Sequence, residues 1–376
     1  MKTKITIILL IVLALTACAS REIRPGVYVT DEPDSLPLPT DGYRLYIVGE
    51  AHGNRETKAL FIAYLKRLHA QAGLRDVILE EDQAYESTAN AFVLGESETL
   101  LPALCLRNDV LSLIREFNAT LPENEKVKVH LVDVDSPLST AHLHLQSLRK
   151  RIGVPADAIQ IPELAEFETL SPAQMYGLIS ELKTAAAEDA YVVNGLQTVR
   201  DSIQWYFLGN RIETGPAVGF RFSFAPIRED IIARNVQFLL DSSDAPFLTF
   251  FGGAHAMKMQ ADPNPPRKGF TSWAQRIVES GISVYSLDTL PLSGGYFWRG
   301  SAYPYDAANE ATLLPDGTSL SQLLIEQDKN ILYVDLRIAE NATSTLPPEY
   351  SNIPAGQVYD GQVVFRMVTE MEDACR

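Results

Sequence analysis

Residues 43–82, YRLYIVGEAHGNRETKALFIAYLKRLHAQAGLRDVILEED, decide the fold of this chain. The stretch opens with the short apolar run Tyr46–Val48 and closes with a second one, Val77–Leu79. Between them, apolar side chains recur at helical spacing, at Leu60, Phe61, Tyr64, Leu65 and Leu68. A strand, an amphipathic helix and a second strand in this order are typical of an α/β fold with parallel strands.

The same alternation continues along the chain. Further β-branched or aromatic runs lie at 127–132, 247–251, 283–287, 331–336 and 362–367. Residues 155 to 240 are predicted to be mostly helical, because the alanines at 185–187 favour helix over strand. We therefore predict a single α/β domain over residues 42–376, with a mainly parallel central sheet flanked by helices and a helical insertion at about 155–240.

The first residues, MKTKITIILLIVLALTACAS, have the pattern of a targeting segment. Two lysines precede the apolar run Ile5–Leu15, which has the length of a signal-peptide core and is too short to span a bilayer. The following LTAC resembles the lipobox of bacterial lipoproteins. That resemblance implies a signal peptide over residues 1–17 and lipid attachment at Cys18. The proline-containing residues 18–41 are then expected to form a tether.

Lipidation of Cys18 would place the protein on a membrane. Ala19 follows the cysteine, whereas an aspartate there usually signals retention in the inner membrane of Gram-negative bacteria. We therefore expect attachment to the outer membrane, facing the periplasm. Cys105 and Cys375 would remain as thiols in a compartment that permits disulfides, and sequence leaves open whether they pair.

The charge balance restricts the partners. Lys and Arg number 32 against 48 Asp and Glu, so the formal net charge is −16. A body this acidic repels phosphate backbones, which argues against a nucleic-acid partner. Three cysteines are too few for a disulfide scaffold or a four-cysteine zinc site. We expect a small-molecule substrate or ligand, and membrane contact through the lipid alone.

Polar side chains follow four of the predicted strands. The runs end at Glu50 and His52, at Glu80, at Asp133 and at His255. Each residue alone has an ordinary structural explanation, such as a hydrogen-bonded histidine or a helix cap. Parallel sheets bind ligands at the carboxyl ends of their strands, so the four ends together predict one shared site.

A basic residue provides a further candidate for this site. The segment REDIIARN, residues 228–235, is predicted to be helical and places Arg228 and Asn235 on one face. Arg228 either decorates a solvated helix end or reaches over the pocket as an anion or oxyanion clamp. The residues of the segment leave both alternatives open.

Five short motifs in this order resemble the superfamily of erythromycin-esterase-like proteins and haem-binding ChaN lipoproteins, which also includes Tiki and TraB-related proteins. They are GEAHG at 49–53, the block at 78–95 with Glu80 and Asn90, VHLVD at 129–133, REDIIARN at 228–235, and FFGGAHAMK at 250–258. One residue separates Glu50 from His52, where esterase members usually have two. This spacing is closer to that of ChaN.

The esterase resemblance implies a hydrolase of an unknown ester or amide, with no cofactor. His52 would act as general base on a water, with Glu50 or Glu80 orienting its ring. His255 and Arg228 would stabilise the oxyanion or protonate the leaving group. The supporting residues would be Asp133, Asn90 and Asn235. No serine lies in a G-x-S-x-G turn near these strands, which disfavours a serine hydrolase.

Two alternatives follow from the other members. Resemblance to the Tiki proteases implies a divalent metal held by His52, Glu80 and His255. Resemblance to ChaN implies a haem- or ligand-binding lipoprotein without catalysis, in which a histidine or tyrosine would be the axial ligand. We expect the hydrolase first and the haem-binding protein second.

Overall fold

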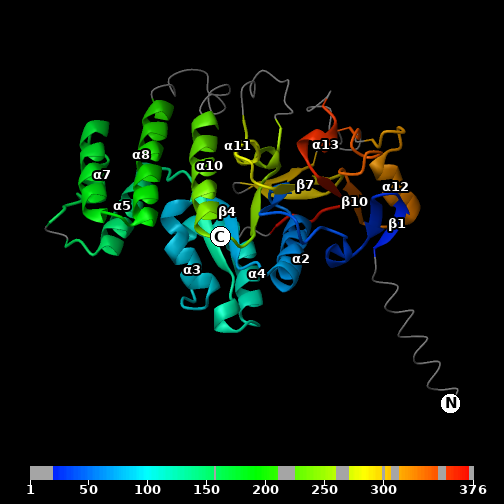
Figure 1. Ribbon diagram of the computed structural model, residues 1–376, viewed down its shortest axis with the longest axis horizontal. Coiled ribbons are helices and arrows are strands. Elements are labelled where there is room, and N and C mark those ends of the chain that lie inside the picture. Colours follow the sequence, from blue (N-terminus) through cyan, green and yellow to red (C-terminus); the bar gives the residue numbers. More distant parts are fainter. Residues whose placement is uncertain are drawn as a thin grey trace, which may run out of the picture. The chain divides into compact units, whose positions relative to one another are not determined.

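The computed structural model describes residues 20–155, 158–210, 225–259, 271–298, 301–305, 313–345 and 353–371. Within these ranges the chain has the predicted mixed α/β architecture, with mainly parallel strands flanked by helices (Figure 1). It divides into two compact units, which we call unit 1 and unit 2. Unit 1 comprises residues 1–74, 250–263 and 283–376, and unit 2 comprises residues 75–249 and 264–282.

This division differs from the single domain expected over residues 42–376. The chain leaves unit 1 after Leu74 and returns to it at Phe250, in the middle of a strand. No proline-rich linker marks these two crossings, whereas the later crossing after Pro263 lies in the sequence DPNPP, residues 262–266. No helix in the described part of the chain has the length and apolar character needed to cross a bilayer.

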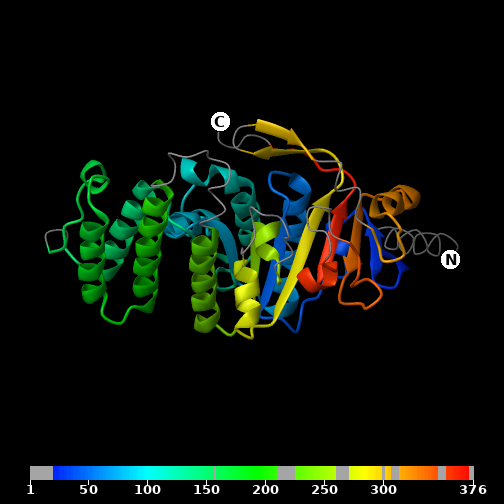
Figure 2. The same cartoon turned by 90° about the horizontal axis from the view of Figure 1, so that it is seen from above.

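The strands of unit 1 form a mixed sheet (Figure 2). The central pairs β11–β7 and β7–β3 are parallel, and the pairs β1–β2, β2–β10 and β10–β11 are antiparallel. The strands are, in sheet order, β1 (Arg21–Arg24), β2 (Val27–Thr30), β10 (Ile331–Asp335), β11 (Gly361–Phe365), β7 (Val284–Pro291) and β3 (Leu45–Glu50).

The helices of unit 1 are few, and one of them follows β3 directly. Asn54 caps this helix, because its side-chain Oδ1 accepts the Thr57 backbone N–H at 2.9 Å. The unit also holds a separate hairpin of β8 (Gly295–Trp298) and β9 (Ser301–Pro304). Its helices are η1 (Pro33–Ser35), α2 (Arg55–Ala72), η5 (Gly253–Ala256), α12 (Leu320–Gln327) and α13 (Ala355–Val358).

The tether expected over residues 18–41 is wrong for its central part. Residues 21–30 form β1 and β2, and β2 pairs with β10 so that Val27 lies opposite Val334 and Val29 opposite Leu332. Both valines of β2 are buried. Two strands of four residues are too short to produce a clear alternation of apolar and polar residues, and the nearby prolines suggest a loop instead.

Unit 2 combines two strands with most of the helices of the chain. Strands β4 (Asp76–Asp82) and β5 (Lys128–Asp133) are parallel, with Asp82 opposite Asp133. Strand β6 (Phe247–Gly252) begins in unit 2 and ends in unit 1. The helices are η2 (Gln83–Tyr85), α3 (Glu86–Val93), η3 (Pro102–Arg107), α4 (Asn108–Asn118), η4 (Glu123–Glu125), α5 (Leu138–Ile152), α6 (Leu164–Phe167), α7 (Pro172–Ala186), α8 (Ala190–Asn210), α10 (Ala225–Ser242) and α11 (Trp273–Glu279).

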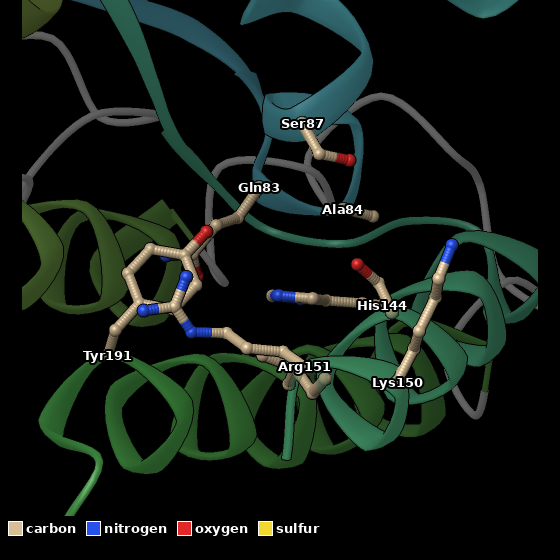
Figure 3. A pocket seen from close by; sticks show the side chains of 9 residues that line it. Gln83, Ala84, Ser87, His144, Lys150, Arg151 and Tyr191 are labelled. Atoms are coloured by element: carbon tan, nitrogen blue, oxygen red, sulfur yellow. The ribbon is translucent and has the colours of Figure 1, made fainter. Parts of the chain in front are cut away.

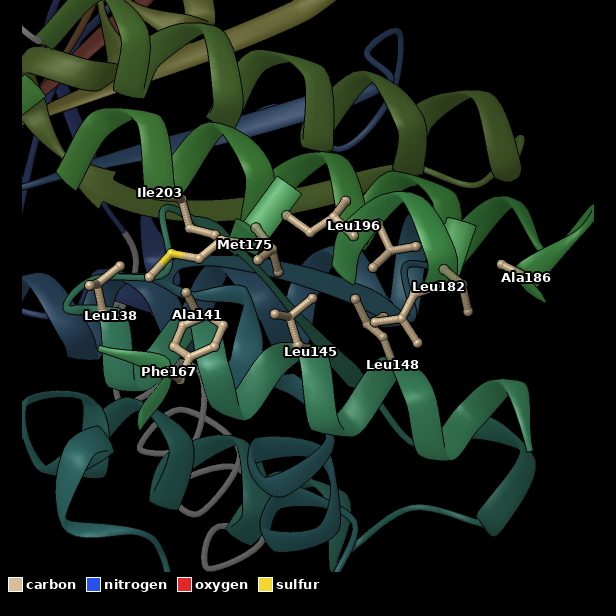
Figure 4. Close-up of a cluster of buried hydrophobic side chains, with 13 residues drawn as sticks. Leu138, Ala141, Leu145, Leu148, Phe167, Met175, Leu182, Ala186, Leu196 and Ile203 are labelled. Carbon is tan, nitrogen blue, oxygen red and sulfur yellow. The ribbon is translucent and has the colours of Figure 1, made fainter. Parts of the chain in front are cut away.

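The helical region expected at about 155–240 corresponds to α6, α7, α8 and α10. Helices α5, α7 and α8 pack together around a buried apolar cluster that includes Leu145, Phe167, Met175 and Leu196 (Figure 4). A capping box at Ser171 starts α7. Each leucine fully buried in such a cluster stabilises the fold by about 1.5–3 kcal/mol, so the helices need no sheet strand to hold them together.

Candidate functional site

Glu50 and His52, the acid and histidine of the first motif, form a hydrogen-bonded pair in unit 1. Glu50 is the last residue of β3 and is buried, whereas the His52 side chain is 32% exposed. Glu50 Oε1 lies 2.9 Å from His52 Nδ1. Because a carboxylate accepts, Nδ1 carries the proton and Nε2 is the nitrogen with the basic lone pair. Of the two acids expected to orient the ring, Glu50 therefore does so.

The glycine of the same motif allows close packing behind this pair. A Cβ on Gly49 would lie 3.1 Å from three atoms, namely Gly253 Cα, Ala256 Cβ and the Leu287 carbonyl oxygen. A side chain at position 49 would push η5 away from β3. This close packing explains why the motif begins with glycine.

Two residues that sequence reasoning missed hold the loop after β3. The Thr289 hydroxyl donates to the Gly49 carbonyl at 2.6 Å and accepts from the Ala51 N–H at 3.0 Å. The Tyr305 hydroxyl donates to the His52 carbonyl at 2.9 Å, and burial raises the pKa of this phenol. Both residues lie more than two hundred positions from the motif, so no local pattern connects them with it.

His255 belongs to the same unit and lies in η5, directly after β6. Its ring packs edge-on against Phe251, with centroids 6.3 Å apart. Among the residues that the structure describes, no group of three or more His, Cys, Asp or Glu side chains close enough to share an ion includes His255. The metal-ligand role expected of His255 stays a prediction.

The other candidate residues form an ionic cluster in unit 2, at the carboxyl ends of β4 and β5. Arg228, from the first turns of α10, donates from Nε to Asp133 Oδ1 at 2.8 Å and from Nη2 to Glu80 Oε1 at 2.6 Å. Nη2 also contacts Asp133 Oδ2. Burial lowers the pKa of Arg228, but the two carboxylates outweigh it and raise this pKa well above its usual value.

This cluster excludes one of the two alternatives for Arg228. Its Nε and Nη2 are engaged by carboxylates, so Arg228 is not the decoration of a solvated helix end. Glu80 and Asp133 together carry more charge than Arg228, and its role as an anion or oxyanion clamp stays a prediction. Its main effect is to hold the ends of β4 and β5 in a fixed arrangement.

Asp82 is a further acid at this strand end, and its chemistry was missed. Burial and the nearby Asp135, Asp133 and Glu81 raise the pKa of Asp82 to about 9, although the Ser136 N–H donates to it at 3.2 Å. The carboxyl group is therefore neutral at pH 7 and able to donate a hydrogen bond. The acidic run at residues 80–82 was the only signal, and it equally fits a solvated loop.

The two asparagines expected to support the site both bind the backbone of β5. Asn90 Nδ2 donates to the Val129 carbonyl at 2.7 Å and its Oδ1 accepts the Val129 N–H at 3.0 Å. This contact is four residues before Asp133, or about 13 Å along β5. Asn235 is buried and donates to the Val132 carbonyl at 2.9 Å. Both side-chain amides make hydrogen bonds with backbone groups of β5 that a neighbouring strand would otherwise make.

The predictions for the three cysteines fall where the structure does not test them. Cys18 and Cys375 lie outside the described residues, and only the backbone of Cys105 is described, in η3. Lipidation at Cys18 and a bridge between the other two cysteines therefore stay predictions.

Comparisons with known proteins show the fold. No family model and no curated protein matches the sequence. Three solved structures align over nearly the whole length of both chains. A protein from Bacillus cereus is 16% identical with a TM-score of 0.63, and covers 95% of this chain and 97% of its own. A succinoglycan biosynthesis protein is 11% identical with a TM-score of 0.63, and covers 94% and 96%.

The third structure is a mutant of the erythromycin esterase EreC in its open conformation. It is 14% identical with a TM-score of 0.58, and covers 89% of this chain and 93% of its own. Haem-bound ChaN of Campylobacter jejuni aligns with a TM-score of only 0.29, which is too low to compare the folds. The chain therefore has the erythromycin-esterase-like fold that its motifs predict.

Proposed function

We propose that the chain is an esterase-like hydrolase in which His52 is the general base. The observation that carries the proposal is the pairing of Glu50 with His52 Nδ1 at 2.9 Å, beside a ring that is one third exposed. The carboxylate fixes the tautomer and stabilises the imidazolium that forms when Nε2 takes a proton. The likeness of the fold to erythromycin esterase EreC supports the same class of reaction.

The reaction needs only water as a second reactant. Nε2 of His52 removes a proton from water as the oxygen adds to the carbonyl carbon of an ester or amide. The bond to the leaving group then breaks, and the leaving group receives a proton as it departs. His255 is the residue of unit 1 that we propose for the oxyanion or the leaving group.

Within unit 2, we propose that the ionic cluster of Glu80, Asp133 and Arg228 binds a polar part of a ligand. Glu80 and Asp133 lie towards the carboxyl ends of the parallel strands β4 and β5, and α/β sheets bind ligands at that end. Because the carboxylates outnumber the guanidinium, the cluster favours a neutral or cationic part of the ligand over an anionic one. Substitution of Arg228 by Lys should therefore weaken ligand binding, since a lysine cannot hold both acids.

The test is hydrolysis of a panel of activated esters and lactones by His52→Gln. We expect the rate to fall about 10²- to 10⁴-fold while the melting temperature stays unchanged. The matched control is His142→Gln, because His142 is a structural histidine that contacts the Pro162 carbonyl and a glutamine amide keeps that contact. If His52→Gln hydrolyses the esters as fast as the unchanged protein, the proposal is wrong.

The metal and haem alternatives give different results in one preparation. An absorption spectrum and a metal analysis of the purified protein distinguish them, since haem gives a Soret band and a metallohydrolase holds stoichiometric metal. We expect neither, because the His52 mechanism needs no cofactor.

Anchoring by lipid at Cys18, on the periplasmic face of the outer membrane, remains part of the proposal. The support is the lipobox-like LTAC sequence alone. Several acyl chains make a stable anchor. Cys18→Ser should therefore release the protein into the soluble periplasmic fraction, and retention of this variant in membranes would contradict lipidation.

A further inference from the structure

Unit 2 contains a cavity of about 360 Å³ between η2, α5 and α8 (Figure 3). Its volume lies within the range of about 300–1,000 Å³ that is usual for small-molecule sites. None of the residues proposed for hydrolysis lines it. The proposed hydrolase function therefore does not account for this cavity.

A buried acceptor without a donor belongs to one of the residues that line this cavity. The side chain of Gln83 is part of the lining and is only 6% exposed. Its Oε1 is buried and has no hydrogen-bond partner among the residues that the structure describes. Buried carbonyl groups are nearly always satisfied, so this oxygen indicates a missing donor such as a hydroxyl group.

A buried histidine presents a second polar atom to the same space. His144 Nδ1 lies 2.6 Å from Asp135 Oδ2, and the Ala84 N–H donates to Asp135 Oδ1 at 2.9 Å. His144 Nδ1–H donates this hydrogen bond to the carboxylate, which leaves Nε2 for another partner. Figure 3 shows the ring of His144 reaching into the cavity between Gln83 and Arg151.

Positive charge lines the edge of the cavity. The ammonium group of the Lys150 side chain has no ion pair or hydrogen bond within the described ranges. Its neighbour Arg151 stacks over the Tyr191 ring at 4.3 Å. Arg151 also donates to Asp189 at 3.2 Å. Cations in the last turn of α5 interact favourably with the helix dipole whether or not a ligand binds. That effect explains neither the cavity nor the unsatisfied oxygen of Gln83.

We propose that this cavity binds a small anion that also carries hydroxyl groups, of the class of sugar phosphates and sugar acids. The anionic group pairs with Lys150 at the edge. One hydroxyl donates to Gln83 Oε1, and another contacts Nε2 of His144. The sugar ring packs against the apolar part of the lining, which includes Ala84, Leu148 and Tyr191. This inference does not rest on the proposed hydrolase function.

The experiment is calorimetric titration of the full-length protein with glucose 6-phosphate, glucuronate, glucose and inorganic phosphate. We expect glucose 6-phosphate or glucuronate to bind saturably, and glucose and phosphate to bind at least about tenfold more weakly. Whichever of the first two binds more tightly identifies the anionic group as phosphate or carboxylate.

Two variants locate the binding in this cavity. Lys150→Gln should weaken binding of the anionic sugar about tenfold or more, and Gln83→Met should weaken it through loss of the acceptor. Lys183→Gln, on an exposed part of α7, is the matched control and should change nothing. Lys150 is exposed, so its substitution tests the site even if Gln83→Met does not fold.

The result that overturns the inference is equally definite. It is wrong if none of the four compounds binds saturably up to about 10 mM. It is also wrong if binding occurs but Lys150→Gln leaves the affinity for the anionic sugar unchanged.

Discussion

Two of the histidine–carboxylate pairs of this chain, one in each unit, have different surroundings. In unit 1, His52 lies 2.9 Å from Glu50 and its side chain is 32% exposed. In unit 2, His144 lies 2.6 Å from Asp135 and its side chain is only 3% exposed. The hydrogen-bonded groups are the same. The difference in exposure gives the two rings different roles. The His52 ring is in contact with water, whereas the His144 ring lines a cavity between helices.

The largest difference between the two pairs should appear when each acid is removed. Asp135→Ala leaves a buried imidazole and the Ala84 N–H without their acceptor, so we expect a loss of about 3–5 kcal/mol in the free energy of unfolding. Glu50→Ala should lower stability less, because water reaches His52, and should lower the rate of ester hydrolysis more. Urea unfolding and hydrolysis rates measured on both variants test this. Equal losses of stability would remove the contrast.

A smaller effect is expected from filling the space beside the buried pair. A Cβ on Gly195 would lie 2.9 Å from Leu148 Cδ2 and 3.2 Å from His144 Nε2, so α8 has no room for alanine there. Gly195→Ala should destabilise the protein by about 1–3 kcal/mol. Gly177 of α7 provides the control, because a Cβ there would meet no described atom within 4 Å.

The control should change stability in the opposite direction. Gly177→Ala should raise the free energy of unfolding by about 0.5–1 kcal/mol, since alanine favours the helix. Thermal unfolding of the two variants measures the difference. A Gly195→Ala variant as stable as the original chain would contradict the close packing of α5 against α8.

A third histidine, His130, should make the stability of the protein depend on pH. Burial lowers the pKa of His130, but the hydrogen bond with Asp76 and the nearby Glu86 outweigh it and raise this pKa to about 9. A raised histidine pKa means that the folded state binds the proton more tightly. Its contribution is full below about pH 6.5 and is lost as the pH rises to about 9, with a slope of at most about 1.4 kcal/mol per pH unit.

Asp82 should contribute with the same sign, because its pKa is also raised to about 9. The folded state holds that proton from about pH 4 upwards, where the unfolded chain has lost it, so stability falls with rising pH. Urea unfolding from about pH 6 to 9 should therefore show decreasing stability, and His130→Gln should reduce the slope. A slope that this substitution leaves unchanged would contradict the account of His130.

Local patterns predicted the strands and the ends that carry acids and histidines. The apolar runs ending at Glu50, Glu80 and Asp133 are strands β3, β4 and β5, because buried parallel strands are continuous apolar runs in sequence. The pairing of Glu50 with His52 is also local, two residues apart. These features depend on neighbours in the chain, which a sequence displays directly.

The features that sequence missed depend on distant partners. Thr289 and Tyr305 hold the loop of His52 from more than two hundred residues away. The motif positions of Asn90 and Asn235 were visible, but their bonds to the backbone of β5 were not. The same holds for Arg228, whose charge is compensated by two acids that only folding brings to it.

The division of unit 1 into three segments has a consequence for how the chain is made. Strand β2 near the N-terminus pairs with β10, some three hundred residues later, and β3 pairs with β7. During synthesis, the first strands and α2 leave the ribosome long before their partners exist. Unit 2 lies almost entirely within residues 75–249 and has its own apolar cluster, so it can fold while the rest is still being translated. We therefore expect unit 1 to close last, and a chaperone that shields its early strands to raise the yield of folded protein.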